Sequence, residues 1–563
     1  MPFDYRTLDP ALRDKLLTGC AGKLHLASMA RDALALAGAC AARGEQPRAA
    51  FYAVLGGDLL LAAWEEEPLS GVLAQPLRTV LAGNPHLPGA FFDALAWLEG
   101  HFTPDPAVQR LLDAGRVPAA LEALRAGLAR TPDNAFHVQK LLELCPVEGD
   151  PDEARAALAA FPAGPAEPFR RIAQADLELA CGRPDAAEPH YLAALETCPL
   201  PGVHARLGLC RHRQGRPREA RTLWTAVLQR RPWHVNLLLR LHDELSGAAN
   251  AAAPLPGGLE ILLYTHNKAD DLARALDALE AAGLDGCRVT VLDNDSGDGT
   301  AELLRRTADR LGAERLRTIT APVNVGAPAA RNWLVRALRN DAPRPFAAFL
   351  DDDALVPGDW RERFGAAVAA APAAAVWGCK VVDAARPWIV QNPDLHLRPE
   401  YTADTAAARL SVNSLTTDLH HQGLDFGQFD YLRPCVSVTG CCHLFRTETL
   451  LAGGGFDIAF SPTQFDDLDH DLRLGRAGGW ACYQGHLTVR HLKNTGQAAR
   501  RGGVAAGNAL GNHLKLQARH APADMAALRR VDLERCLADL SAKAARVNRL
   551  TGHDEAPESD VSN

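Results

Sequence analysis

Three consecutive aspartates, Asp351–Asp353, end an apolar run in the segment "FLDDDALVPGDW". Adjacent like charges repel, so this cluster costs stability unless a positive charge lies beside it. In an extended chain Asp351 and Asp353 point to the same side. Oxygen ligands at an acidic site suit Mg²⁺ or Mn²⁺. The triplet therefore predicts a divalent metal site; the alternative is that it caps the helix expected after Pro357.

A second acidic cluster lies in "FDDLDHDL", which contains Asp466, Asp467 and Asp469. Transfer of a group to a hydroxyl needs a general base near the acceptor oxygen, and a carboxylate can serve. The helix dipole also favours acidic residues at a helix start, which is the structural alternative. Asp469 and Arg473 are four residues apart and are predicted to pair on one helix face.

Polar side chains also end two further predicted strands. Thr265–Asn267 follow "LEILLYTH", and Asp293–Asp295 follow "CRVTVLDN". Strands and helices alternate from here through "PFAAFLDD", which predicts a mostly parallel sheet covered on both faces. Ligands of such sheets bind beyond the carboxyl ends of the strands. The three polar clusters are therefore expected to form one site.

The motifs, taken in order, resemble the family 2 glycosyltransferases of the GT-A fold. The resemblance covers about 259–491 and rests on "LYTHN", "VLDNDSGDGT", "NVGAPAARN", "FLDDDALVPGDW", "VTGCCHLFR", "GGFDIAF" and "FDDLDHDLRLGRAG". It implies that Asp351 and Asp353 form the D-x-D motif, in which a metal bridges the diphosphate of a nucleotide sugar. It also implies an inverting single displacement with Mn²⁺ or Mg²⁺ as cofactor.

The resemblance also implies a nucleotide-sugar site. Its residues would be Thr265, His266, Asn267, Asp293, Asp295, Asn324, Gly326, Arg331, Asp351 and Asp352. Asp293 would hydrogen-bond the base, most often uracil. His266 stands where the family usually has an aromatic residue. Arg331 would reach a phosphate or hold the aspartates, unless it lies on a helix surface.

The remaining implied roles concern the metal and the base. The metal ligands would be Asp351, Asp353 and His491, although a late histidine in a chain with 20 of them is as readily structural. Asp467 would be the general base, because "DDLD" stands where the family has Glu-Asp-x-Asp and Asp466 replaces the glutamate.

The first half of the chain is helical and repetitive. Gly115, Gly149, Gly182 and Gly215 each precede an Ala-rich helical segment and recur every 33 or 34 residues. This period resembles the tetratricopeptide repeat, whose helix pairs bury their apolar faces by stacking. The alternative is an irregular helical bundle. The repeats are expected to bind a protein partner or to position the enzyme on its acceptor.

The predicted fold is an all-α repeat region, an α/β GT-A domain and a short helical extension. The predicted boundaries are 1–100 for a helical region that could hold degenerate repeats, 101–248 for tetratricopeptide-like repeats, 249–258 for a linker, 259–500 for the GT-A domain, 501–550 for the extension and 551–563 for a disordered tail.

Composition limits the function further. The net charge is −8, which provides no basic surface for nucleic acid. The N-terminus lacks a basic head followed by an apolar core, and the longest small-apolar run contains Pro372. These features predict a cytoplasmic protein. Peripheral attachment to the inner face of the membrane is compatible with the same features.

The predicted reaction moves a sugar from a nucleotide-diphospho donor, with UDP-sugars first among them, to a hydroxyl of a glycan, a lipid-linked glycan or a protein. Two alternatives stay open. A nucleotidyltransferase would want a Gly-rich basic loop after the first strand, and "LYTHNKADD" lacks one. A repeat scaffold with an inactive transferase-like domain would need only the fold.

Overall fold

The computed structural model describes residues 3–339, 343–399, 414–493 and 504–552. The chain divides into two compact units. The helical unit comprises Met1–Leu241, Leu419–Gln428 and Lys543–Asn563. The sheet unit comprises His242–Asp418 and Phe429–Ala542. Within the described ranges, no helix has the length and apolarity needed to cross a membrane.

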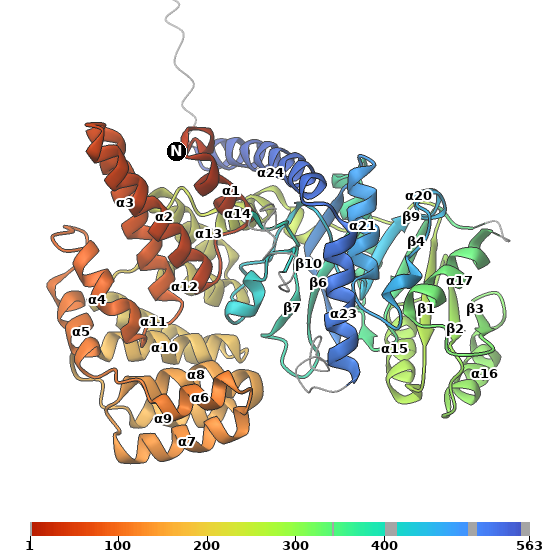
Figure 1. Cartoon of the computed structure of the whole chain (residues 1–563), viewed down its shortest axis with the longest axis horizontal. Coiled ribbons are helices and arrows are strands. Elements are labelled where there is room, and N and C mark those ends of the chain that lie inside the picture. Colours follow the sequence, from red (N-terminus) through yellow and green to blue (C-terminus); the bar gives the residue numbers. More distant parts are fainter. Residues whose placement is uncertain (1–2, 340–342, 400–413, 494–503, 553–563) are drawn as a thin grey trace, which may run out of the picture. The chain divides into compact units, whose positions relative to one another are not determined.

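The region before residue 250 is entirely helical, as predicted (Figure 1). Its helices are α1 (Pro10–Thr18), α2 (Lys23–Ala42), α3 (Gln46–Glu65), α4 (Gly71–Val80), α5 (Gly89–Gly100), α6 (Pro106–Asp113), α7 (Val117–Arg130), α8 (Ala135–Glu148), α9 (Pro151–Ala160), α10 (Glu167–Ala180), α11 (Pro184–Thr197), α12 (Pro201–Arg213), α13 (Pro217–Arg230) and α14 (Val235–Ser246), with short 3-10 turns η1 (Tyr5–Thr7), η2 (Gly164–Ala166) and η3 (Ala248–Asn250). Several begin with proline, whose fixed φ suits a first helical position.

Three of the recurring glycines lie in the turn between two paired helices. Gly115, Gly182 and Gly215 have φ of +67°, +75° and +76°, a conformation that other residues adopt only with strain. They join α6 to α7, α10 to α11 and α12 to α13. Gly149 differs, because it ends α8 with φ −112°. The periodic glycines therefore mark helix pairs, while their assignment to the tetratricopeptide class stays a prediction.

The sheet unit is built on one mixed sheet. Its strands are β1 (Leu259–Thr265), β2 (Cys287–Asp293), β3 (Leu316–Thr320), β4 (Phe346–Leu350), β5 (Ala354–Leu355), β6 (Val376–Asp383), β7 (Val390–Asn392), β8 (Leu432–Cys435), β9 (Cys442–Arg446) and β10 (Ala481–His491). The order is β3-β2-β1-β4-β9-β6-β10-β5, with β7 on β6 and β8 on β10. The first four strands are parallel, as predicted, whereas β9 is antiparallel to both β4 and β6.

Helices pack against this sheet (Figure 1). They are α15 (Ala269–Ala281), α16 (Thr300–Leu311), α17 (Ala327–Arg339), α18 (Trp360–Ala370), α20 (Thr447–Ala452), α21 (Asp466–Arg476), α23 (Val504–Arg519) and α24 (Pro522–Leu550), with the short turn η6 (Ile458–Phe460). The predicted apolar face of α15, formed by Leu272, Leu276 and Leu279, is buried in the core with β1. The predicted fold class, with an all-α region, an α/β domain and C-terminal helices, is confirmed.

The two units are not continuous in sequence. The segment Leu419–Gln428, which contains the 3-10 turn η5 (Leu419–Gln422), groups with the helical unit although it lies inside the predicted range 259–500. The end of α24 also groups with the helical unit. The predicted tail, 551–563, lies outside the described residues from position 553 onward. The linear boundaries given above stay predictions.

Candidate active site

A cleft at the carboxyl ends of β1 and β4 gathers most of the predicted residues. The parallel register of β1 and β2 pairs Thr265 with Asp293, so both strands end at the same edge. The aspartate triplet follows β4 directly, and the amide of Asp351 donates to the carbonyl of Cys441 at 2.9 Å. Residues lining this cleft include Tyr264, His266, Lys268, Asn324, Gly326, Arg331, Asp351, Asp352, Asp353, Gly440, Cys441, Asp466, Asp467 and His491.

Lys268 and His491 surround the triplet with positive charge. The Lys268 ammonium lies 2.8 Å from Asp352 Oδ1 and 2.8 Å from Asp353 Oδ2. His491 Nε2 lies 2.7 Å from Asp353 Oδ1 and 3.8 Å from Asp351 Oδ2. These contacts compensate the like charges that the sequence crowds at the end of β4.

The three carboxyls differ in how readily they ionise. Burial and the charge of Asp353 raise the pKa of Asp351 to about 6. Burial also raises the pKa of Asp352. Burial acts in the same direction on Asp353, but the hydrogen bond and charge of His491 and the charge of Lys268 outweigh it and hold that pKa well below its usual range. Asp353 is therefore the carboxylate that stays ionised.

The donor set fits a hard divalent cation. Ligand atoms of Asp351, Cys441 and His491 lie within 4.8 Å of one another, and Asp353 lies within hydrogen-bond distance of the same imidazole. Gln391 Oε1 lies 2.9 Å from His491 Nδ1, which directs Nε2 toward the aspartates. Burial raises the pKa of the Cys441 thiol well above its usual value. Sulfur is also a soft ligand, whereas Mg²⁺ and Mn²⁺ prefer carboxylate oxygens.

Arg331 joins the two acidic clusters across the cleft. This buried side chain of α17 lies 2.8 Å from Asp466 Oδ2 through one terminal nitrogen and 3.8 Å from Asp351 Oδ1 through the other. Its guanidinium also lies over the rings of Tyr264, Phe349 and Phe456. Of the two roles considered for Arg331, the geometry favours holding the aspartates.

Asp467 lies at the start of α21 and receives its hydrogen bonds from backbone amides. Gly440 N donates to Oδ2 at 2.7 Å and Leu468 N donates to Oδ1 at 2.9 Å. A Cβ on Gly440 would come within 2.7 Å of Arg331 and 2.8 Å of Asp467 Oδ2. Glycine at position 440 therefore allows the close approach that holds the half-buried carboxylate in the cleft wall.

The other acidic residues of α21 are paired inside the protein. Asp469 lies 2.8 Å from Arg473, the predicted partner, and 3.0 Å from His520, which follows α23 directly. Asp471 accepts a hydrogen bond from Ser437 Oγ at 2.7 Å and lies 3.2 Å from His443. These carboxylates hold α21 in place, which leaves Asp467 as the cleft-facing member of the cluster without an ion pair among the described contacts.

The predicted nucleotide residues fall into two groups. His266, Asn324, Gly326 and Arg331 line the cleft together with the triplet. The other four, Thr265, Asn267, Asp293 and Asp295, do not line the cleft.

The second group instead shapes neighbouring loops. Asp293 Oδ1 accepts from the amide of Ser296 at 3.0 Å, and Asn267 Oδ1 accepts from the amide of Gly297 at 2.7 Å. Asp295 is exposed and has φ +65°.

Three residues of the site escaped the sequence interpretation. Lys268 lies in "LYTHNKADD", which the sequence interpretation used only because it lacks a Gly-rich basic loop; the positive charge at a strand end was the available signal. Gln391 lies in the short strand β7 and has no local pattern that marks it. Gly440 becomes visible only once Asp467 and Arg331 are placed around it.

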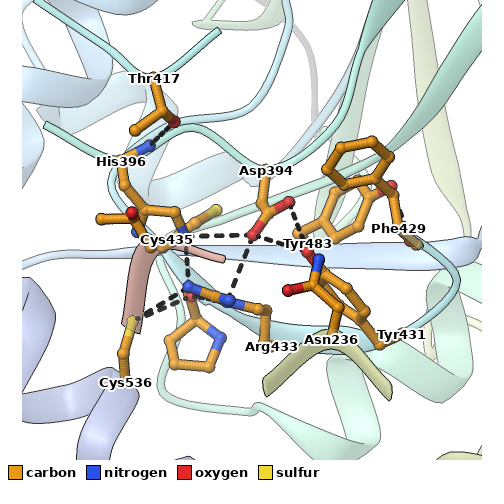
Figure 2. Close-up of polar contacts among 12 residues, drawn as sticks. Asn236, Asp394, His396, Thr417, Phe429, Tyr431, Arg433, Cys435, Tyr483 and Cys536 are labelled. Carbon is orange, nitrogen blue, oxygen red and sulfur yellow. Dashed lines mark hydrogen bonds and ion pairs between the residues drawn. The ribbon is translucent and has the colours of Figure 1, made fainter. Parts of the chain in front are cut away.

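A second group with metal-ligating side chains lies elsewhere in the sheet unit (Figure 2). His396 lies 2.8 Å from Asp532 of α24, and Cys536 is close by. Arg433 fills this space, because its guanidinium lies 2.5 Å from His396 Nε2 and 3.2 Å from Asp394 Oδ2. A permanent cation at hydrogen-bond distance from a ligand atom opposes metal binding. The network therefore anchors α24 to the segment before β8.

Residues 260–424 match the family model described as Glycosyl transferase family 2. The chain carries a glycosyltransferase family 2 domain. The triplet and the residues that end β1 and β2 lie inside the matched range, whereas Asp467 and His491 lie after it.

Solved structures that are similar to this chain include the following three. Mannosyltransferase PcManGT from Pyrobaculum calidifontis in complex with GDP-Man and Mn²⁺ is 18% identical with a TM-score of 0.33, over 57% of this chain and 88% of its own. GalNAc-T7 with UDP, GalNAc and Mn²⁺ is 11% identical with a TM-score of 0.33, over 47% and 48%. S. aureus TarS is 12% identical with a TM-score of 0.27, over 40% and 35%. No curated protein sequence matches the chain.

Proposed function

We propose that the family 2 domain is a metal-dependent inverting glycosyltransferase. It would take a nucleotide-diphospho sugar, with UDP as the first candidate nucleotide, and transfer the sugar to a hydroxyl of a glycan, a lipid-linked glycan or a protein. One observation carries the proposal: Asp351, Asp353 and His491 line the same cleft as Asp467, and Arg331 lies between the two acidic groups.

The metal side of the cleft would hold the donor. Asp351, Asp353 and His491 would bind Mn²⁺ or Mg²⁺, which when bound would neutralise the charge that develops on the departing nucleoside diphosphate. Lys268 already contacts Asp352 and Asp353, so its ammonium lies beside the place where phosphate oxygens would come. Arg331 keeps the two walls of the cleft at a fixed spacing.

The opposite wall would activate the acceptor. Asp467 would accept the proton of the acceptor hydroxyl as its oxygen attacks the anomeric carbon. The bond from that carbon to the diphosphate oxygen breaks on the opposite side, and the electron pair leaves with the nucleoside diphosphate. The amides of Gly440 and Leu468 orient the Asp467 carboxylate without neutralising it, which supports its use as a base.

Calorimetry with the full chain tests the donor side. UDP and GDP are titrated in the presence of Mn²⁺ and again with EDTA. We expect one nucleoside diphosphate to bind tightly only with the metal. Equal affinity in both conditions would contradict the metal-dependent reading of the triplet.

A panel of nucleotide sugars tests the reaction. Slow hydrolysis of one donor with Mn²⁺ present is expected, and NMR of the released sugar would show the anomeric configuration opposite to that of the donor. Retention of configuration would exclude the inverting mechanism. Nucleotide binding without turnover of any donor or acceptor would favour the inactive scaffold.

A further inference from the structure

The helical unit contains a pocket whose polar lining is mostly hydrogen-bond acceptors, together with the lysine Lys23. Glu66 and Glu67 follow α3, Gln139 and Glu143 lie on α8, and Asp176 lies on α10. These residues come from three separate parts of the sequence, and their side chains line one cavity. The chemistry of the lining therefore suits a ligand that donates hydrogen bonds and carries positive charge.

The carboxylates of the pocket are only partly compensated. Arg206 serves two of them, at 2.7 Å from Asp176 and 3.6 Å from Glu66. The longer distance is beyond a hydrogen bond. Burial raises the pKa of Glu66 above its usual value despite Arg206, and it raises the pKa of Asp176 to about 6. Both shifts arise chiefly from burial, which disfavours the ionised carboxyls even with Arg206 nearby.

Glu67 and Glu143 lie within electrostatic reach of each other, although each is paired with a lysine. Each has one lysine partner, Lys23 for Glu67 and Lys140 for Glu143. Burial raises the pKa of Glu67, and the charge of Glu143 raises it further. Two carboxylates within electrostatic reach of each other in a half-buried pocket favour a cation between them.

Gln139 provides an independent sign of a missing donor. Its side chain is only 3% exposed and its Nε2 donates to Glu143 Oε1 at 3.3 Å. Its Oε1 accepts no hydrogen bond from any residue that the structure describes. A buried amide oxygen without a donor costs free energy, and a donor entering the pocket would remove that cost.

The rest of the pocket is apolar and well anchored. Leu142 and Val147 of α8 and Leu177 of α10 line it beside the polar groups. Leu424 and Phe426 of the inserted segment Leu419–Gln428 form a further wall.

Specific contacts hold that inserted wall in place. Gln422 Oε1 accepts from the amides of Leu24 and His25 at 3.0 and 3.2 Å. The Asn236 side chain donates to the carbonyl of Gln428 at 2.7 Å. The wall is therefore fixed within the helical unit, and the pocket is a formed site.

We propose that this pocket binds an arginine side chain of a partner polypeptide. The guanidinium would donate to Gln139 Oε1 and to the carboxylates of Glu66, Glu67 and Glu143, and the aliphatic stem would lie along the leucine and valine side chains. Arginine fits better than lysine because its five donors can serve several acceptors at once. The pocket belongs to the helical unit, so this recognition goes beyond sugar transfer and does not depend on it.

Peptide binding to the full chain tests the proposal. Ac-Ala-Ala-Arg-Ala-Ala-NH₂ is titrated by NMR, and the same peptide with citrulline in place of arginine is the matched probe, because citrulline keeps the shape and loses the charge. We expect the arginine peptide to bind at least about tenfold more tightly, the range of one or two charge-assisted hydrogen bonds.

Two variants locate the binding in the pocket. Glu143→Gln and Gln139→Met should each weaken the arginine peptide by about tenfold or more. Glu122→Gln, on the exposed face of α7 and outside the pocket, is the control and should leave binding unchanged. Thermal unfolding shows whether each variant is folded. If Glu143→Gln does not fold, the affinity of Gln139→Met for the arginine peptide decides whether the pocket is the binding site.

Three outcomes would overturn the proposal. The first is equal binding of the arginine and citrulline peptides, or no binding of either. The second is unchanged affinity in both pocket variants. The third is spermidine binding as tightly as the arginine peptide, which would assign the pocket to free amines instead of a polypeptide. None of these outcomes alters the expected metal dependence of nucleotide binding, so the two proposals fail separately.

Discussion

The sheet unit contains two clusters of aspartates whose surroundings differ. In Asp351–Asp353 the positive charges come from Lys268 and His491, which both line an open cleft. In α21 the partners of Asp469 and Asp471 are buried or packed against the helix.

The difference is therefore one of access. An ion-pair partner that lines a cleft can be replaced by a ligand, whereas a partner enclosed by packing cannot. Under the proposed function, the same residue type would serve chemistry in one cluster and mostly folding in the other. Asp467 is the member of α21 that escapes this rule, because backbone amides hold it at the cleft.

Removing Asp353 should have the largest effect. Asp353→Ala deletes the carboxylate that contacts both Lys268 and His491. We expect Mn²⁺-dependent nucleotide binding to disappear and turnover to fall by at least about a thousandfold, since a bound metal supplies several kcal/mol of charge stabilisation. Calorimetry and a turnover assay measure both. Asp309→Ala, on the exposed face of α16, is the control. If Asp353→Ala still bound the nucleotide in a metal-dependent way, the triplet would not differ from the α21 cluster by binding a ligand.

Asp467→Asn should separate binding from catalysis. The change keeps the size and most hydrogen bonds of the side chain but removes its basicity. Turnover should fall by at least about a hundredfold, the lower range for a positioned general base. Affinity for UDP and Mn²⁺ should stay near that of the wild type. Near-normal turnover, or a loss of UDP binding as large as in Asp353→Ala, would show that Asp467 is not the base.

Asp469→Asn should affect stability more than chemistry. It weakens the contacts with Arg473 and His520, and we expect the free energy of unfolding to fall by about 1–3 kcal/mol. Burial raises the pKa of Asp469, but the hydrogen bonds from His520 and Arg473 outweigh it and lower that pKa. A lowered pKa stabilises the fold above the unfolded value of about 3.9 and loses this effect as the pH falls.

The pH dependence gives that experiment its control. Denaturant unfolding of the wild type and of Asp469→Asn should differ most near neutral pH, and the difference should shrink below about pH 4. A difference that is constant across this range would show that the ionised carboxylate is not what stabilises α21. Turnover per folded molecule should stay within about tenfold of the wild type, in contrast to Asp467→Asn.

Lys268→Met should have the smallest effect and should depend on the metal. Without Lys268, Asp352 and Asp353 lose a shared cation, so the melting temperature in EDTA should fall by about 1–2 °C, equivalent to about 1 kcal/mol. Mn²⁺ should raise the melting temperature of the variant more than that of the wild type, because the ion replaces the missing charge. Lys268→Arg is the matched control. If Mn²⁺ raised the melting temperature of Lys268→Met and of the wild type equally, the metal ion would not replace the charge of Lys268 at the triplet.

Much of the fold could be predicted because its signals are local. Alternating strands and helices indicated the parallel half of the sheet, and the recurring glycines indicated helix turns, since each pattern depends on neighbouring residues only. The antiparallel β9 and the grouping of Leu419–Gln428 with the helical unit depend on pairing between distant segments. No period or turn signal in the sequence encodes such pairing.

By itself, the sequence determined that acidic clusters end strands and begin a helix, and that the motifs follow the order of a known family. Only the tertiary structure decided which charges meet. Arg331 and Asp466 are 135 residues apart, and His491 and Asp353 are 138 apart. The same holds for the pocket where Gln139 lies near Glu67. Electrostatic interactions depend on distance in space, and the chain brings these groups together only through the packing of helices and strands that local patterns specify one at a time.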